Sequence, residues 1–341
     1  MTTTEIPPRT VPSHELVGDY WFHSEPVPVA ALRGNVILLL FWDLSSVPSL
    51  KALPYVEEWH ARYGSAGLVV IGVHSPRYRF ASNPEIVLDT LGRTGIRYPV
   101  VCDNQQQIAG VYNVRSIPSF VVIDGEGFVR CHCDGDGDYE AIEHAIRSLL
   151  HRAGRAEDLP EPAGLLRNED DRRAIRYRST PNLEAGYIHR DCGNAESMVP
   201  EALSSFADPG IYIGGRIYVD GSWYSGREFL RFEETGAYRG SVLVRFNAQE
   251  VYAVLEPERR SEAEVTVILD GQPLSEALRG EDVLTSQERS IVRVKTARPY
   301  QLVQNGDLEE HLLCLTTDSP GLSFYSFSFV AGAVPETISK N

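Results

Sequence analysis

Apolar and polar positions divide the chain into two parts. From residue 19 to residue 152, short apolar runs alternate with stretches in which apolar residues recur every three or four positions, a pattern typical of strands followed by amphipathic helices. The predicted strands are Val36–Trp42, Leu68–His74, Pro99–Cys102, Ser119–Asp124 and Phe128–Cys133. The predicted helices are Pro48–Tyr63, Pro84–Arg93, Gln105–Tyr112 and Tyr139–His151. This order predicts an α/β domain, in which helices cover both faces of a sheet.

The chain from residue 177 to residue 332 has a different pattern. Its apolar runs alternate with period two or contain many β-branched and aromatic residues, and clusters of Gly, Pro and Asp separate them. Clear runs are Ser241–Phe246, Val251–Leu255, Glu264–Leu269, Ile291–Lys295 and Leu322–Val330. Few helices fit this region, so we expect an all-β sandwich with a jelly-roll-like architecture.

Residues 153–176 are charged, contain prolines and show no apolar period, so we interpret them as a linker that proteases should cut first, around Glu157 to Asp171. The predicted organisation is an N-terminal extension over residues 1–18, an α/β domain over 19–152, the linker over 153–176, the sandwich over 177–332 and a tail over 333–341. A chain of 341 residues with 43% hydrophobic composition can fill two cores of ordinary size.

The net charge and the cysteine content limit the classes of partner and the cellular compartments that we expect. A net charge of -15 opposes binding to phosphate backbones and anionic lipid, so we expect neither nucleic acid nor a membrane as a partner. The first residues lack the pattern of a secretory signal, and the apolar run Val36–Trp42 is much shorter than the roughly 20 residues that span a bilayer. Five cysteines, an odd number, do not indicate a disulfide framework, and we predict a cytoplasmic location.

The most informative stretch joins the first long strand to the next helix. It reads Phe41-Trp42-Asp43-Leu44-Ser45-Ser46-Val47-Pro48-Ser49, and Pro54 follows inside the helix. This stretch resembles the thioredoxin superfamily, in which a Cys-x-x-Cys sequence opens the helix and a proline lies a few residues inside it. Ser46 and Ser49 stand at the two cysteine positions. A second stretch, Ser116-Ile117-Pro118-Ser119-Phe120, resembles the cis-proline loop of the superfamily, which implies a cis bond at Pro118.

More narrowly, the chain resembles DipZ-type and TlpA-type thiol-disulfide interchange proteins of the redoxin group. In the first part, the resemblance is carried by LRGNVILLLFWD, LPYVEEWHARY, GLVVIGVHSP, IRYPVVCDN and GDGDYEAIEHAI. After the predicted linker, the chain resembles the β-sandwich of DipZ-like proteins in the stretches TPNLEAGY, DGSWYSG, VRFNAQEVYAVLEP, LDGQP, RPYQLV and FYSFSFVAG. The resemblance implies a thioredoxin-like α/β domain followed by this sandwich.

The two serines remove the ordinary chemistry of that superfamily. Thiol-disulfide exchange requires a thiolate, and a serine hydroxyl can neither form nor resolve a mixed disulfide. We therefore predict a degenerate site with no catalytic residue, in which Ser46 caps the helix and Ser49 is equally inert. A hydrolytic role for Ser46 would need a nearby base, and His23 and His74 are the histidines that other loops would bring close.

Other residues with possible chemistry are interpreted as structural. Cys131 and Cys133 flank His132 on a predicted strand, so both thiols lie on one face and the imidazole lies on the other, which opposes joint metal binding. Cys102 is expected to be buried. The alternating acids from Asp134 to Asp138 lack the turn glycine and the glutamate of a calcium loop. We predict no metal and no cofactor.

The resemblance also implies a substrate groove beside the cis-proline. We expect Trp42, Val47 and Pro48 to form its floor, and Ile117 and Pro118 to form its edge. The favoured hypothesis is a non-catalytic module that binds a protein or peptide by main-chain pairing in this groove, or acts as a scaffold. One alternative is a thiol-disulfide oxidoreductase or peroxidase that uses Cys102, Cys131 or Cys133. Another is an engineered Cys-to-Ser form of an active oxidoreductase. The aromatic residues of the sandwich are interpreted as core, and its ligand is unknown.

Overall fold

Two units make up the chain, residues 1–174 and residues 175–341, each with its own buried core. The computed structural model describes residues 4–5, 11–155, 159–171, 173–233, 239–259, 261–305 and 309–332. The predicted tail, residues 333–341, and residues 156–158 and 172 of the predicted linker lie outside this described part.

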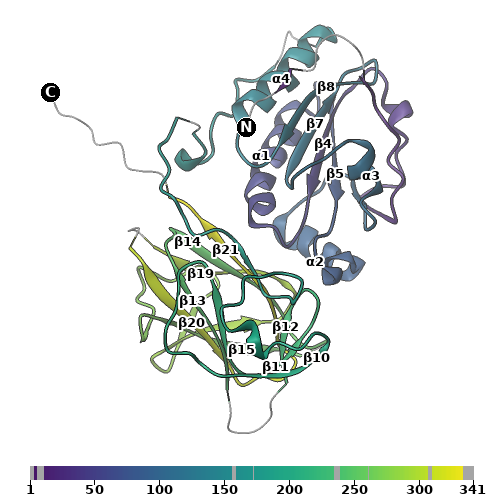
Figure 1. Ribbon diagram of the computed structural model, residues 1–341. Helices are drawn as coiled ribbons and strands as arrows, with labels where there is room; N and C mark the ends of the chain where they lie inside the picture. Colours follow the sequence, from purple (N-terminus) through teal and green to yellow (C-terminus); the bar gives the residue numbers. More distant parts are fainter. Residues whose placement is uncertain are drawn as a thin grey trace, which may run out of the picture. The chain divides into compact units, whose positions relative to one another are not determined.

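The first unit is built on one mixed sheet with the strand order β1-β8-β7-β4-β5-β6-β3, and β2 also pairs with β8. Figure 1 labels the four strands β8, β7, β4 and β5 of this sheet. The strands are β1 (Thr4–Glu5), β2 (Val11–Pro12), β3 (Tyr20–Phe22), β4 (Val36–Trp42), β5 (Leu68–His74), β6 (Val100–Cys102), β7 (Ser119–Ile123) and β8 (Phe128–Asp134). The pairs β4–β5 and β5–β6 are parallel, and the other pairs are antiparallel.

Four α-helices accompany this sheet, and all four were predicted with ends within two residues of those observed. They are α1 (Val47–Tyr63), α2 (Pro84–Thr94), α3 (Gln107–Val111) and α4 (Tyr139–Arg152), with short 3₁₀ helices η1 (Val29–Leu32), η2 (Arg79–Ser82) and η3 (Asn168–Asp170). Asp138 occupies the expected N-cap position of α4, but its backbone is left-handed and its side chain makes no capping hydrogen bond. Within the described residues, no helix combines the length and the apolar composition needed to cross a membrane.

The helices lie on both faces of the sheet, as the alternating pattern predicts. Phe120 of β7 makes edge-to-face contacts with Trp59 of α1 and Tyr139 of α4. Its neighbour Val121 belongs to the cluster that contains Ile108 of α3. Because successive strand residues point to opposite faces, α1 and α4 cover one face and α3 covers the other.

Three short strands were not predicted. β1 and β2 pair with β8, and β3 extends the opposite edge by pairing with β6. Leu16, between β2 and β3, is buried in the α3-side core. The described part of the predicted extension therefore belongs to the domain, and strands of two or three residues are too short to show an apolar period.

The segment 159–171, which was predicted as part of a linker, lies against α1 and α4. Glu143 of α4 is 3% exposed and accepts hydrogen bonds from the Tyr63 hydroxyl at 2.6 Å and from the N–H of Ala163 at 2.7 Å. The Tyr55 hydroxyl accepts a second backbone N–H of the segment at 2.9 Å. These buried partners explain why a charged sequence without an apolar period is ordered, and they place the segment in the first unit.

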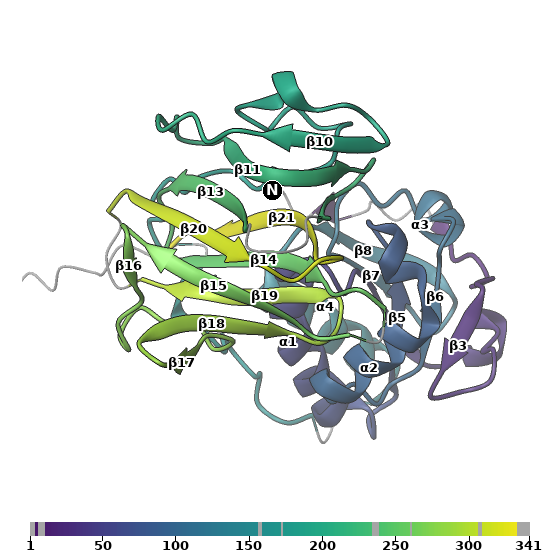
Figure 2. The same cartoon turned by 90° about the horizontal axis from the view of Figure 1, so that it is seen from below.

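The second unit is a β-sandwich, as predicted (Figure 2). Its strands are β9 (Leu183–Glu184), β10 (Ala202–Phe206), β11 (Ile217–Ser225), β12 (Leu230–Phe232), β13 (Gly240–Phe246), β14 (Glu250–Glu256), β15 (Ala263–Leu269), β16 (Gln272–Pro273), β17 (Leu284–Ser286), β18 (Arg289–Val294), β19 (Arg298–Gln304), β20 (His311–Thr317) and β21 (Ser323–Val330), with one short 3₁₀ helix, η4 (Ala195–Ser197).

β11 joins the two sheets of the sandwich. Its first half pairs with β13 and its second half pairs with β10 and β12. Gly221 lies between the halves with a positive φ of 96°, a conformation that favours glycine and permits the change of partner. The core contains Val244 from one sheet and Phe327 from the other, and Trp223 is buried with them as expected.

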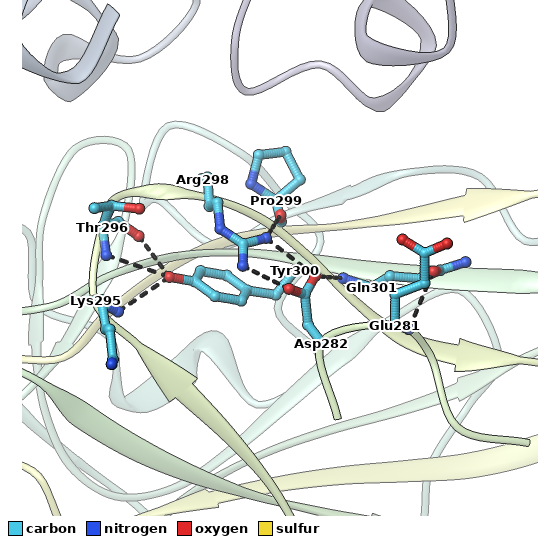
Figure 3. A network of polar contacts seen from close by, with 8 residues as sticks. All are labelled: Glu281, Asp282, Lys295, Thr296, Arg298, Pro299, Tyr300 and Gln301. Atoms are coloured by element: carbon cyan, nitrogen blue, oxygen red, sulfur yellow. Dashed lines mark hydrogen bonds and ion pairs between the residues drawn. The ribbon is translucent and has the colours of Figure 1, made fainter. Parts of the chain in front are cut away.

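A polar network fixes the start of β19 (Figure 3). The Arg298 guanidinium donates two hydrogen bonds to the Asp282 carboxylate, at 3.0 and 2.5 Å, and its centre lies 3.8 Å from the centroid of the Tyr300 ring. The Tyr300 hydroxyl donates to the carbonyl of Thr296 and accepts the N–H of Lys295. An arginine that is both paired with a carboxylate and stacked on a ring is held in one position, which indicates a structural role.

Candidate functional site

The turn from β4 into α1 is the candidate site. β4 lies between β5 and β7 in the centre of the sheet, and all of its residues are buried. Ser46 is the N-cap of α1, with an extended backbone at φ -93° and ψ 113°. Pro48 lies in the first turn, where its missing N–H leaves no helical hydrogen bond unmade. The predicted helix start is therefore confirmed.

Both serines at this helix start are held by hydrogen bonds. The half-buried Ser46 accepts the backbone N–H of Ser49 on its Oγ at 3.3 Å, which is the predicted capping role. Ser49 is fully buried, and its Oγ accepts the backbone N–H of Asp43 at 3.2 Å. The first position is thus partly accessible and the second is enclosed, with hydroxyl groups where thiol chemistry would need sulfur.

A buried polar group lies beside this helix start. Asp43 accepts hydrogen bonds from the N–H of Ser45, at 3.1 Å, and from the Ser45 hydroxyl. Asp43 Oδ1 lies 3.7 Å from Nε2 of His74, which is the last residue of the neighbouring strand β5. That nitrogen accepts the N–H of Leu44 at 3.3 Å, so the ring proton belongs on Nδ1.

Burial changes the titration of both groups. The loss of hydration raises the pKa of Asp43 to about 6, although hydrogen bonds from Ser45 and the positive charge of Arg77 oppose this increase. Burial lowers the pKa of His74 to about 3. His74 is therefore neutral at pH 7 and its contact with Asp43 is not an ion pair.

His74 does not serve Ser46 as a base, because its accepting nitrogen is occupied by the N–H of Leu44. His23, the other histidine considered, has its Nδ1 3.3 Å from the carbonyl oxygen of Tyr98. The arrangement gives Ser46 a capping geometry, and among the described residues no base forms the hydrogen bond with its hydroxyl that a hydrolase nucleophile needs.

The second predicted landmark lies at the start of β7. The bond between Ile117 and Pro118 is cis, as the resemblance implies. The Pro118 carbonyl accepts the N–H of Gly135 at 2.8 Å, and Asp134 Oδ1 accepts the Ser119 hydroxyl at 2.6 Å. Within the described residues, the backbone N–H and C=O of Ile117 make no hydrogen bond. The end of β8 therefore holds this loop and leaves one residue open for main-chain pairing.

Only part of the predicted groove is accessible. Pro48 and Ile117 are partly exposed, whereas Pro118 is buried. Trp42 is 0% exposed and Val47 is 2% exposed, which differs from the predicted floor. Trp42 ends β4, a central strand covered on both faces, and Val47 begins α1, which packs on that sheet, so both side chains support the loop from within the core.

The remaining cysteines of the first unit are buried. Burial and the nearby Asp19 carboxylate raise the pKa of Cys102 to about 12, which opposes a nucleophilic role. Cys131 and Cys133 point to the same side of β8, as the alternation predicts, and their sulfur atoms are 3.6 Å apart.

Sequence reasoning missed Asp43 and Asp134. Asp43 directly follows the longest apolar run, and a carboxylate at the end of a buried strand is a signal that was available. Asp134 was considered only as a calcium ligand, because its link to Ser119 depends on the pairing of β7 with β8.

Known proteins resemble both units. The AhpC/TSA family model matches residues 8–132, and the model of the thioredoxin-like C-terminal domain matches residues 186–329. Protein DipZ of Mycobacterium bovis is 28% identical over 257 residues, which are 75% of this chain and 36% of DipZ, so the chain spans about a third of that relative.

Two shorter matches are to thiol-disulfide proteins. The thiol-disulfide oxidoreductase ResA of Geobacillus kaustophilus is 28% identical over 118 residues, 34% of this chain and 64% of ResA. The solved structure of a thiol-disulfide isomerase from Corynebacterium glutamicum is 24% identical, covers 41% of this chain and 96% of its own, and has a TM-score of 0.38. Residues 8–132 are therefore similar to the AhpC/TSA family and residues 186–329 to the thioredoxin-like C-terminal domain, the order in which the resemblance places the two domains.

Proposed function

We propose that the first unit is a non-catalytic binding module, which pairs its main chain with an extended segment of a protein or peptide at Ile117. The observation that carries this proposal is the open backbone of Ile117, two residues before Ser119, which pairs with the end of the strand that leads into Ser46 and Ser49. β-augmentation pairs an incoming segment with unpaired main-chain N–H and C=O groups, and Ile117 offers both in the loop before β7. Pro48, partly exposed on the first turn of α1, would supply an apolar contact.

The hydrogen bonds of the two serines support the non-catalytic part of the proposal. Each hydroxyl oxygen accepts a backbone N–H, and neither bond requires a sulfur atom. The site is thereby stabilised as a structural turn. We place the protein in a reducing cytoplasm, because an odd number of cysteines does not indicate a disulfide framework. We also propose a scaffold role, in which the sandwich binds a ligand of its own.

Peptide binding is tested with the full chain and fluorescein-labelled insulin B chain whose cysteines are alkylated. Because this probe is extended and has no thiol, any rise in its anisotropy reports non-covalent binding. We expect Ile117→Pro, which removes the open N–H, to weaken binding about tenfold or more. Ile117→Val keeps the main chain and should bind as the wild type does. Equal binding by all three proteins would refute the assigned edge.

Catalysis is tested by dithiothreitol-coupled reduction of insulin. Without a thiolate at the helix start, turbidity should rise at the protein-free rate. An acceleration that persists after Cys102, Cys131 and Cys133 are all replaced by Ser would contradict the proposal.

A second candidate function is a thiol-disulfide oxidoreductase or peroxidase that uses the remaining cysteines. The distance of 3.6 Å between the sulfur atoms of Cys131 and Cys133 favours this pair over Cys102. Faster reduction of insulin by dithiothreitol in the presence of the protein, lost in Cys131→Ser, would support this candidate over the binding module.

A further inference from the structure

Cys131 and Cys133 are close enough to react with each other. Their sulfur atoms are 3.6 Å apart, and the side chains are 4% and 5% exposed. Cys133 pairs with Phe120 in the β7–β8 ladder, so both thiols lie on the face of the sheet that α1 and α4 cover. A disulfide bond needs the two sulfur atoms at about 2.05 Å, which is an approach of roughly 1.5 Å.

The residues directly after this pair hold the loop of the proposed peptide edge. Asp134 accepts the hydroxyl of Ser119 at 2.6 Å, and its partner in the ladder is Ser119 itself. Gly135 donates its N–H to the carbonyl of Pro118 at 2.8 Å. Ile117 therefore depends for its position on the end of β8, one to two residues beyond Cys133.

We propose that Cys131 and Cys133 form a reversible redox site, in which oxidation to an intramolecular disulfide releases the loop at Ile117 and weakens peptide binding. The inference deepens the proposed function, because the regulated surface is the edge assigned there. It assigns a modification to two thiols that the binding module does not otherwise use.

The oxidant is a small peroxide. One sulfur attacks the O–O bond of hydrogen peroxide, which leaves a sulfenic acid and releases one water molecule. The second sulfur attacks the sulfenic sulfur, so the S–S bond forms, the S–O bond breaks and the oxygen departs as a second water molecule. Two thiols and one hydrogen peroxide thus give one disulfide and two water molecules. A dithiol reverses the change by thiol-disulfide exchange.

The strand geometry explains why this reaction would reach the loop. In an extended strand, Cα atoms two residues apart are separated by about 6.6–6.8 Å. Disulfides prefer a Cα separation of about 5.5–6 Å, and about 6.8 Å is the upper limit. Closing the bond therefore shortens β8 locally, and the displacement falls on Asp134 and Gly135, which bind the loop.

The direct test uses the full chain, hydrogen peroxide and intact-mass spectrometry. After oxidation, the mass should fall by about 2 Da, the mass of two hydrogen atoms. Maleimide labelling under denaturing conditions should modify three of the five cysteines, since two are linked, and all five after dithiothreitol. Peptide mapping should place the link between Cys131 and Cys133.

The effect on the loop is measured on the same oxidised sample. Hydrogen exchange at the amide of Gly135 should become about tenfold faster, because its bond to Pro118 opens more often. The alkylated insulin B chain should bind several-fold more weakly than to the reduced protein. Cys133→Ser should abolish both changes, whereas Cys192→Ser, in the other unit, should leave both intact.

The possible results test the redox site, its coupling to the loop and the proposed peptide binding separately. The redox site would be overturned by any of three results after peroxide treatment: five reactive thiols, sulfinic acid without a disulfide, or a disulfide to another cysteine. These results come from the wild-type protein, so they hold even if a variant fails to fold. A disulfide that leaves Gly135 exchange and peptide binding unchanged would overturn the coupling. Absence of binding to the reduced protein would count against the proposed function alone, because the mass measurement does not depend on it.

Discussion

Asp43 Oδ1 lies 3.7 Å from Nε2 of His74, yet the two buried groups do not form an ion pair. Burial raises the pKa of the carboxyl to about 6 and lowers that of the imidazole to about 3, so His74 is neutral when Asp43 is charged. The pair therefore links stability to pH in two opposite directions.

The sign of each contribution follows from the two pKa shifts. The folded pKa of Asp43 is raised, so its contribution to stability is full below about pH 3.8 and is lost as the pH rises through about 6. The folded pKa of His74 is lowered, so its contribution is full above about pH 6.5 and is lost as the pH falls. Between pH 4 and 6, the two contributions offset each other.

The first prediction concerns Asp43→Asn. This change removes the raised carboxyl pKa and leaves the titration of His74, so the variant should lose more stability than the wild type between pH 6 and pH 4. At pH 7.5 it should be more stable than the wild type by about 1–3 kcal/mol, because no buried charge remains. Urea unfolding at several pH values measures both effects. His74→Leu should change the slope in the opposite sense, and parallel pH profiles for all three proteins would contradict the assignment.

The second prediction concerns the cap of α1. Ser46→Ala removes the acceptor of the Ser49 N–H and should lower the free energy of unfolding by about 1 kcal/mol. Ser116→Ala is a matched control, because the Ser116 hydroxyl makes no hydrogen bond within the described residues. If chemical denaturation shows no difference between the two variants, Ser46 does not serve as a cap.

Much of the first unit could be predicted because its elements are long. β4 and β5 are continuous apolar runs, α1 and α4 repeat apolar residues every three or four positions, and all four agree with the predicted ranges to within one residue. The apolar period and the turn residues predict single elements, but they do not indicate which elements contact each other in the folded domain. The burial of Val47, and the link between Ser119 and Asp134, depend on strand order and were therefore not visible in the sequence.

The segment 159–171 is a second case in which contacts across the fold could not be predicted from the sequence pattern. Its charges and prolines indicate a linker, but its position is determined by polar partners on α1 and α4. A composition rule has no access to such partners, since Glu143 looks like any helix-surface glutamate until its burial is known.

The third prediction tests that attachment. Glu143→Ala leaves the Tyr63 hydroxyl and the Ala163 N–H without their acceptor, and should cost about 1–3 kcal/mol of stability. Limited proteolysis should cut within residues 159–171 faster than in the wild type, as mass analysis of the fragments would show. Glu140→Ala, at an exposed position of the same helix, is the control. Equal cleavage rates in the wild type and Glu143→Ala would mean that the segment is not held by this carboxylate.

The fourth prediction asks whether the site is silent only because it lacks sulfur. Ser46→Cys with Ser49→Cys should place two thiols at the start of α1, one partly exposed and one enclosed. The free N–H groups and the dipole of the helix favour a thiolate there, so the thiol at position 46 should titrate below about 7.5. The double variant should form an internal disulfide and gain reductase activity towards insulin, whereas Ser46→Cys alone should form no internal link at this site.

The rate of iodoacetamide alkylation at position 46, followed by peptide mass spectrometry against pH, measures this titration. The charge of Asp43 opposes the thiolate, so adding Asp43→Asn should lower the thiol pKa further. A thiol that titrates near the ordinary value of about 8.5, together with no disulfide, would show that the turn has lost the geometry of a redox site. A lowered pKa would instead show that the two serines alone separate this site from thiol chemistry, because the helix start that activates a thiolate is still present.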